Sequence, residues 1–397
     1  MKRQHRLWLI LVAVSAFVLT PSTSATVQFL PSIAAETTYT DNLEYSGVGS
    51  SSDAAYRLSL DLPISKVWST GQFQFRYNPR LFRFRDQGAL DHTDHFATIA
   101  VQDQLSAKSS LDFTTSYLRT QSQGLFTSLD DPSLVLTERV FRDRLDADVS
   151  FSRQLRPTWS WSVAGGFGTV DNSQISGFGG GLGGSSVEDR TQLRASTSVS
   201  KKLSEKTDIG VDIRVQHNDL ELSGEEEVHA INFSYGRQLS ATGSLSLLAG
   251  VFQTDSQVTG VADRSGAFIR ANYNRDFRRV ALGMFGGHRP TSGGNLPGTA
   301  TDTNVGVSIS GVGSNIWGWD VTAAGTRRDP ADSTAPEIES TGLSGGVSWA
   351  VHPNVGLRIR AASVQQSVDA PMTTDIDVYN VSLGVVWFPR GQQGSRQ

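Results

Sequence analysis

The sequence predicts an all-β chain that closes into a single transmembrane, antiparallel up-and-down β-barrel of about 18 strands. Three observations support this prediction. Apolar and polar residues alternate with a period of two along most of the chain, the connecting segments are by turns short and long, and the tryptophans lie beside the short ones. Together these features are more typical of a membrane barrel than of a soluble sheet.

The composition excludes several other classes of protein. The chain has 397 residues, no cysteine and a formal net charge of -4. Without cysteine it has no disulfide framework, no thiol nucleophile and no thiolate ligand for a metal. The charge balance gives no electrostatic support for a nucleic-acid partner. After residue 25, no apolar run reaches the roughly 18 residues that a membrane helix needs.

Residues 1–25 have the three parts of a secretory signal peptide. Lys2, Arg3 and Arg6 form a positive start, residues 7–19 are an uncharged apolar run, and small residues at 23–25 offer a cleavage site. The alternative is a short membrane anchor. We therefore predict a signal peptide at 1–25 and one β-barrel domain at 26–397.

The strands are predicted from strict alternation, as where Leu58 and Leu60 interleave with Arg57, Ser59 and Asp61. Such a pattern gives a strand one apolar and one polar face. Strands are expected near 31–41, 54–64, 71–84, 94–105, 109–119, 138–154, 159–170, 189–202, 207–218, 227–239, 243–254, 265–275, 279–288, 303–312, 316–327, 339–351, 355–366 and 375–388.

The connections alternate in length, as in bacterial outer-membrane barrels, where short turns face the periplasm and long loops face the exterior. A soluble β-sandwich is the alternative, because its strands also alternate. Because the same period-two alternation continues along the chain, a single closed sheet is favoured. Tight turns are expected at 65–66, 106–107, 156–157, 203–204, 240–241, 276–277, 313–314 and 352–353, and long polar loops include 120–137, 171–188, 289–302 and 328–338.

The tryptophans give an independent indication of the membrane boundary. Amphipathic rings prefer the level of the lipid headgroups. Tryptophans near the short turns or near the C-terminus therefore predict a periplasmic aromatic girdle, formed by Trp68, Trp159, Trp161, Trp317, Trp319, Trp349 and Trp387.

One stretch departs from the regular alternation. Phe73 and Phe75 occupy odd positions, whereas Phe82 and Phe84 occupy even ones. Residues 78–80 lie between them and include a proline, which cannot donate a backbone hydrogen bond to a sheet. We therefore predict a β-bulge at 78–80 that turns the apolar face back toward lipid, leaving Arg83 in the lumen.

If the apolar faces contact lipid, the opposite faces line the lumen, and arginines outnumber aspartates there. The guanidinium group binds carboxylates and phosphates through a planar fork, and basic side chains in pores favour anions. The alternative is that the arginines pair with lumen aspartates and brace the wall. The predicted lumen and selectivity residues are Arg57, Arg76, Arg83, Arg142, Arg144, Asp146, Asp148, Arg190, Arg194, Arg214, Arg270, Arg358 and Arg360.

The last strand carries a resemblance to a known class. Residues 379–388 read YNVSLGVVWF, and Ser382, Gly384, Trp387 and Phe388 match the residue types of the insertion signal in Gram-negative outer-membrane β-barrel proteins. The chain resembles this class over essentially its whole length after residue 25. It resembles more loosely the barrels of exopolysaccharide secretion systems. It departs from the pattern in continuing with Pro389 and a polar tail.

This resemblance implies a location in the cell outer membrane. The implied partners are outer-membrane lipid and the barrel-assembly machinery, and for an exporter also periplasmic polysaccharide export components. No cofactor, metal site or catalytic residue is expected, and the chain is not expected to be an enzyme.

The predicted function is a channel that passes a polar or anionic solute through an arginine-biased lumen. Export of an exopolysaccharide is slightly favoured. The alternatives are a general diffusion porin and a closed structural or adhesion barrel whose external loops bind a partner. Loops 171–188 and 120–137 are the candidates for folding inward and narrowing the lumen.

Overall fold

The computed structural model describes residues 26–42, 51–121, 140–174, 189–221, 224–257, 263–292, 299–314, 316–330, 336–369 and 374–389. These residues form one sheet of 19 strands. The strands are β1 (Thr26–Phe29), β2 (Ser32–Thr40), β3 (Asp53–Trp68), β4 (Gly71–Phe84), β5 (His92–Ser106), β6 (Ser109–Thr120), β7 (Val140–Arg156), β8 (Trp159–Gln174), β9 (Arg190–Ser204), β10 (Thr207–Leu220), β11 (Gly224–Ser240), β12 (Gly243–Ser256), β13 (Arg264–Asp276), β14 (Val280–Ser292), β15 (Thr299–Ser314), β16 (Trp317–Asp329), β17 (Glu337–His352), β18 (Val355–Asp369) and β19 (Thr374–Trp387).

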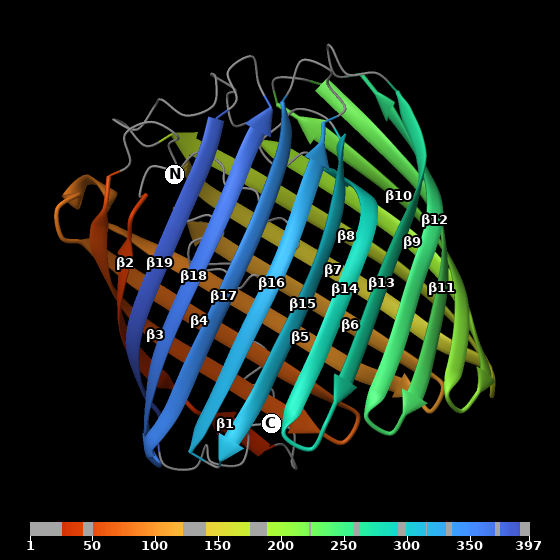
Figure 1. Cartoon of the computed structure of the whole chain (residues 1–397). Helices are drawn as coiled ribbons and strands as arrows, with labels where there is room; N and C mark the ends of the chain where they lie inside the picture. Colours follow the sequence, from red (N-terminus) through yellow and green to blue (C-terminus); the bar gives the residue numbers. More distant parts are fainter. Residues whose placement is uncertain are drawn as a thin grey trace, which may run out of the picture.

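Strands β2 to β19 form a closed cylinder (Figure 1). Each strand pairs antiparallel with the next along the chain, and β19 returns to β2 through pairs from Trp387 with Ile33 to Asn380 with Thr40. Closure satisfies the backbone polar groups, which would each cost several kcal/mol if left unpaired in hydrocarbon. The prediction of an antiparallel barrel with 18 strands is confirmed. No helix among the described residues is long and apolar enough to span a membrane.

The short strand β1 was not predicted from the sequence. It pairs antiparallel with the end of β3, from Thr26 with Val67 to Phe29 with Ile64, whereas β2 pairs with the beginning of β3. Pro31 lies between β1 and β2. Because proline has no backbone N–H, it interrupts the ladder there, and β1 continues the line of β2 along β3 in the same register.

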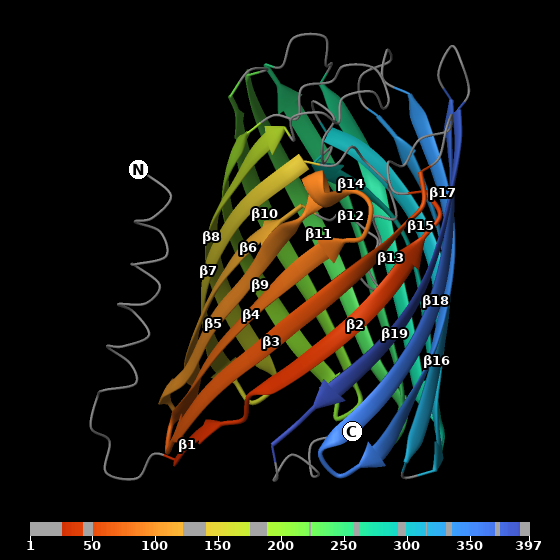
Figure 2. The same ribbon diagram turned by 90° about the vertical axis from the view of Figure 1, so that its left-hand side faces the viewer.

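The two ends of the barrel differ in their connections (Figure 2). At the end where β1 lies, consecutive strands are joined by very short turns, one or two residues from the predicted positions. The exception to that spacing is the turn predicted at 65–66, because β3 continues to Trp68 and turns afterwards. At the other end, β8 continues to Gln174, past the predicted strand end. Residues 122–139 and 175–188, in the loops predicted to fold inward, lie outside the described residues.

The outward face of the barrel is apolar and exposed. Val305, Phe233 and Leu343 are 65%, 61% and 56% exposed. In a soluble sandwich such side chains would be buried between two sheets. A continuous apolar exterior on a closed sheet instead suits contact with lipid acyl chains, and the soluble alternative does not describe this fold.

The predicted bulge at 78–80 is wrong. Strands β3 and β4 keep one register on both sides of this stretch, with Ser59 opposite Arg80 and Leu62 opposite Tyr77, so no extra residue is inserted. The ladder only opens locally, and the Asn78 side-chain amide donates a hydrogen bond of 2.9 Å to the Leu60 carbonyl oxygen. This side chain supplies a donor beside Pro79, which has none.

Because there is no bulge, the even-numbered phenylalanines of β4 point into the barrel. Phe82 and Phe84 form a buried cluster with Ala55 of β3 and Leu90 of the short 3₁₀ helix Gly88–Leu90. Burial of these rings inside the lumen fixes the β4–β5 connection against the wall. The change of the phenylalanines from odd to even positions therefore reflects an internal cluster rather than a change of register.

Candidate lumen site

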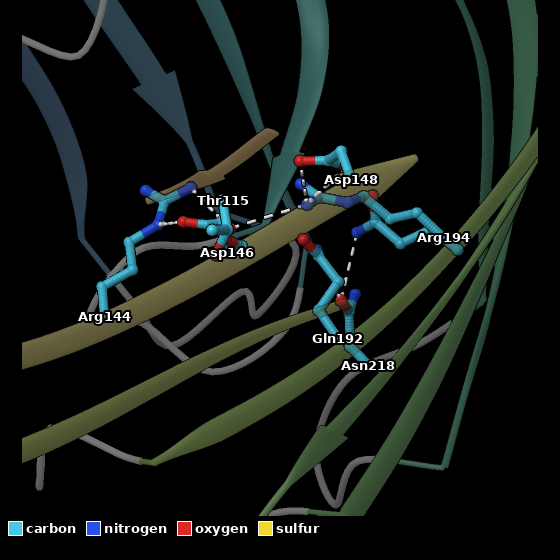
Figure 3. Close-up of polar contacts among 8 residues, drawn as sticks. Thr115, Arg144, Asp146, Asp148, Gln192, Arg194 and Asn218 are labelled. Carbon is cyan, nitrogen blue, oxygen red and sulfur yellow. Dashed lines mark hydrogen bonds and ion pairs between the residues drawn. The ribbon is translucent and has the colours of Figure 1, made fainter. Parts of the chain in front are cut away.

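Cross-strand partners lie on the same face of a sheet, so the register of the barrel assigns every strand residue to the lumen or to the exterior. Figure 3 shows Arg144, Asp146, Asp148 and Arg194 projecting into the space that the sheet encloses. The register places most of the predicted arginines on this lumen face, namely Arg57, Arg76, Arg142, Arg144, Arg190, Arg194, Arg214, Arg270, Arg358 and Arg360.

Arg83 was predicted to line the lumen, and this prediction is wrong. It lies opposite Tyr56, whereas its neighbour Phe82 lies opposite the lumen residue Arg57. Its side chain is 58% exposed and forms an ion pair of 3.2 Å with Asp91. The error follows from the predicted bulge, since one inserted residue would have exchanged the two faces of the strand.

The lumen also contains charged residues that the sequence analysis did not assign. Glu36 of β2 lies opposite Arg57, and Asp302 of β15 lies opposite Arg328 of β16. Asp302 and Arg328 lie just beyond the predicted ends of their strands. Longer alternating windows would have included them. Asp302 and Arg328 offset each other, so of these three residues only Glu36 reduces the predicted surplus of positive charge.

Several lumen arginines are paired and stabilise the wall. Arg57 contacts Glu36 at 2.6 Å. Arg76 binds Asp61 through two hydrogen bonds of 2.6 and 3.0 Å, from Nε and Nη2. These contacts agree with the alternative in which lumen charges brace neighbouring strands.

A denser group of charges lies on β7 and β9, and we call Arg142, Arg144, Arg190, Arg194, Asp146 and Asp148 the arginine cluster. Arg144 contacts Asp146 at 2.5 Å. Arg194 lies 3.1 Å from Asp148 and 3.6 Å from Asp146 (Figure 3). Arg144 and Arg194 thus contact the two carboxylates, and with four arginines against two aspartates the cluster has a positive balance.

The arginines of the cluster nearest the long loops repel one another. Arg144 and Arg190 lie on either side of Val170 at one level of the sheet, and Arg142 lies two residues further along β7. The positive charges of Arg190 and Arg144 both repel the positive charge of Arg142. The Arg142 Nε group donates a hydrogen bond of 3.2 Å to Asn172, a neutral acceptor. A bound anion would reduce the repulsion between these neighbouring guanidinium groups.

An amide network supports the cluster on its β9–β11 side. The Gln192 and Gln216 side chains donate hydrogen bonds of 2.9 and 3.1 Å to the Asn218 oxygen. Asn218, which is fully buried, donates in turn to Glu226 at 3.1 Å. The network links three consecutive strands below Arg190 and holds their polar face in place.

The barrel wall at the short-turn end combines amides and hydroxyls with basic side chains. A pocket of about 600 Å³ is lined there by residues that include Gln72, Gln102, Ser110 and Ser152, together with the charged Lys108, Arg153 and Lys202. Gln72 donates to Gln102 at 3.1 Å, and the Ser110 and Ser152 hydroxyl groups lie 2.8 Å apart. These rungs present amides and hydroxyls on the lumen face of the sheet.

The predicted girdle tryptophans all lie on the outward face close to the short turns. Trp68 and Trp387 end their strands, Trp159 and Trp317 begin theirs, and Trp317 lies opposite Trp349. Trp161 and Trp319 each follow two residues after the start of their strands. Trp68 Nε1 also donates to Asp103 at 3.2 Å. Their role at the lipid headgroups remains a prediction.

Comparison with known proteins shows which solved structures have a similar fold. No protein-family model matches the chain, and no curated protein is similar to it in sequence. Among solved structures, the barrel is similar to OccK2 (OpdF) of Pseudomonas aeruginosa, with a TM-score of 0.50 and 10% identity over 92% of this chain and 99% of that one. It is also similar to a BenF-like porin of Pseudomonas fluorescens Pf-5, with a TM-score of 0.51 and 10% identity over 91% and 98% of the two chains. The chain has the closed, 18-stranded antiparallel barrel fold of these outer-membrane porins.

Proposed function

We propose that the protein is a porin-type diffusion channel that prefers anionic solutes. The arginine cluster on β7 and β9 is the observation that carries this proposal. A closed barrel of this strand number is wide enough for an aqueous channel. A wall that holds Arg142, Arg144 and Arg190 near one another attracts carboxylates or phosphates and repels cations.

The exporter that the sequence slightly favoured receives no support. The solved structures similar to this barrel include a BenF-like porin, and the described residues present no feature that favours a polysaccharide. Diffusion of small polar solutes, the alternative of the sequence analysis, therefore replaces export as the leading function.

Charge reversal in the cluster tests the proposal. Planar-bilayer recordings of the wild-type protein in a salt gradient should show discrete open-channel currents and a reversal potential on the anion side. The double variant Arg142→Glu/Arg144→Glu should move that potential to the cation side, because it replaces two positive lumen charges with two negative ones.

The matched control is Arg83→Glu/Arg119→Glu. It makes the same change of net charge at the same end of the strands, but Arg83 and Arg119 lie on the outward face. This variant should keep the wild-type preference. Equal shifts in both double variants would mean that the cluster does not select the ion. A wild-type protein that folds but never conducts would overturn the channel and favour a closed adhesion barrel.

A further inference from the structure

In three places on the lumen wall, a glycine separates an arginine from a carboxylate at one level of three adjacent strands. We call these arrangements arginine–glycine–acid triplets. They are Arg194, Gly166 and Asp148 on β9, β8 and β7; Arg360, Gly346 and Asp320 on β18, β17 and β16; and Arg358, Gly384 and Glu36 on β18, β19 and β2.

The glycine allows the arginine to reach its partner across the middle strand. Adjacent strands are roughly 4.8 Å apart, so the two charged residues start almost 10 Å from each other. In the first triplet the Arg194 Nη2 group nevertheless lies 3.1 Å from Asp148 Oδ1. The guanidinium group spans β8 directly over Gly166.

A side chain at Gly166 would occupy this space. Its Cβ atom would overlap Asp148 Oδ1 and would lie 3.0 Å from Arg194 Nε. Both atoms belong to flexible side chains, so a larger residue would displace the ion pair rather than the backbone. Because the sheet lies on their other side, side chains displaced from Gly166 move toward the lumen.

The second triplet repeats this geometry almost half-way around the barrel. Arg360 Nη2 lies 3.3 Å from Asp320 Oδ2. A Cβ atom on Gly346 would lie 2.9 Å from Arg360 Cγ and 3.1 Å from Asp320 Oδ1. The third triplet differs, because its acid pairs with the other neighbouring strand: Glu36 Oε2 lies 2.6 Å from Arg57 Nη2, and a Cβ on Gly384 would lie 3.3 Å from the same oxygen.

A level four residues further along β8 shows the contrast. Val170 takes the middle position between Arg144 and Arg190, and the flanking residues there are two arginines instead of an arginine and an acid. Thus β7, β8 and β9 hold a neutralised level at Gly166 and a cationic level at Val170.

We propose that Gly166 and Gly346 determine the bore and ion preference of the channel by letting Arg194 and Arg360 lie flat along the wall. This inference rests on the proposed channel function. Without the glycines, both guanidinium groups project toward the pore axis, where they narrow the path and raise the positive potential. The cationic level at Val170 then ceases to be the main determinant of selectivity.

The variants Gly166→Ala and Gly346→Ala test the inference, with Gly165→Ala as the matched control. Gly165 is the next residue of β8 and faces outward, where a Cβ atom meets only the Arg194 carbonyl oxygen, at 3.9 Å. In planar-bilayer recordings, each test variant should lower the single-channel conductance and raise the anion-to-cation permeability ratio by about twofold. The control should match the wild type. Heat-modifiable migration on gels confirms that each variant is folded.

Two outcomes separate this inference from the proposed function. If the wild type conducts and prefers anions while Gly166→Ala and Gly346→Ala behave like Gly165→Ala, the glycine inference is overturned and the channel stands. If the wild type does not conduct, the channel fails, and a crystal structure of Gly166→Ala still decides the inference. Arg194 remaining in contact with Asp148 in that structure would overturn it, whereas a guanidinium group turned into the lumen would support it.

Discussion

At the scale of single residues, the partner across the strand decides what a lumen arginine does. Arg328 and Asp302 illustrate the fully enclosed case. Two hydrogen bonds, of 2.7 Å from Nε and 2.8 Å from Nη2, join the guanidinium group to both carboxylate oxygens. The side chains are only 6% and 1% exposed. Breaking such a pair leaves a buried charge without compensation, which is more costly than losing an exposed pair.

Removal of one partner should therefore destabilise the barrel. We expect Asp302→Ala to lower the free energy of unfolding in lipid vesicles by about 3–5 kcal/mol. Denaturant unfolding followed by tryptophan fluorescence measures the loss. Asp320→Ala is the control, because the pair of Asp320 with Arg360 is about one-third exposed and has one longer contact of 3.3 Å. It should cost less than about 1 kcal/mol, and equal losses would contradict the role assigned to burial.

At the scale of elements, the seam between β19 and β2 is where the cylinder closes. Its register covers all of β2 except Ser32, but only the second part of β19, from Asn380 to Trp387. Every residue of β2 in this range has a neighbour on both sides, because β2 also pairs with β3. β1 has a single neighbour, β3, and contributes nothing to closure.

A proline in β2 should prevent the barrel from closing. Ala35 lies opposite Val385 of β19 and Leu58 of β3. Ala35→Pro removes one ladder donor within the closed sheet and should abolish most of the folded, heat-modifiable form when residues 26–397 are refolded from urea. Gln28→Pro in β1 makes the same chemical change and should leave most of the protein folded. Similar yields for the two variants would show that pairing of β2 with β19 does not determine whether the barrel folds.

At the scale of the whole molecule, the outward tryptophans lie at one end of an apolar cylinder. The seven girdle tryptophans are all near the short turns, and Trp349 and Trp387 are 39% and 45% exposed. Indole rings prefer the region between headgroups and acyl chains. Their common level therefore predicts where the periplasmic boundary of the membrane crosses the barrel.

Depth-dependent quenching measures this level. In vesicles, tryptophan fluorescence of the folded residues 26–397 should be quenched more strongly by lipids brominated near the headgroup than by lipids brominated near the chain ends. Val305→Trp places an additional ring in the middle of β15, on the outward face, and should increase the deep quenching. Stronger deep than shallow quenching in the wild type would place the girdle away from the boundary.

The strand number, the antiparallel order and the apolar exterior were predictable from the sequence, because a period of two is a local property of each strand. The arginine cluster was predictable for the same reason, since Arg142, Arg144, Arg190 and Arg194 lie within regular alternation. The faces around Pro79 became clear from the pairing of β3 with β4, because a ladder can open without inserting a residue, and the sequence pattern is the same for an internal cluster as for a bulge.

The pairing of charges likewise required the tertiary structure. Arg194 and Asp148 are 46 positions apart, and they meet because the register sets Gly166 between them. Register depends on the turns and on closure of the whole cylinder, so no local window contains it. The sequence could name the charges of the lumen, but which of them are neutralised depends on the residue that the neighbouring strand places between them.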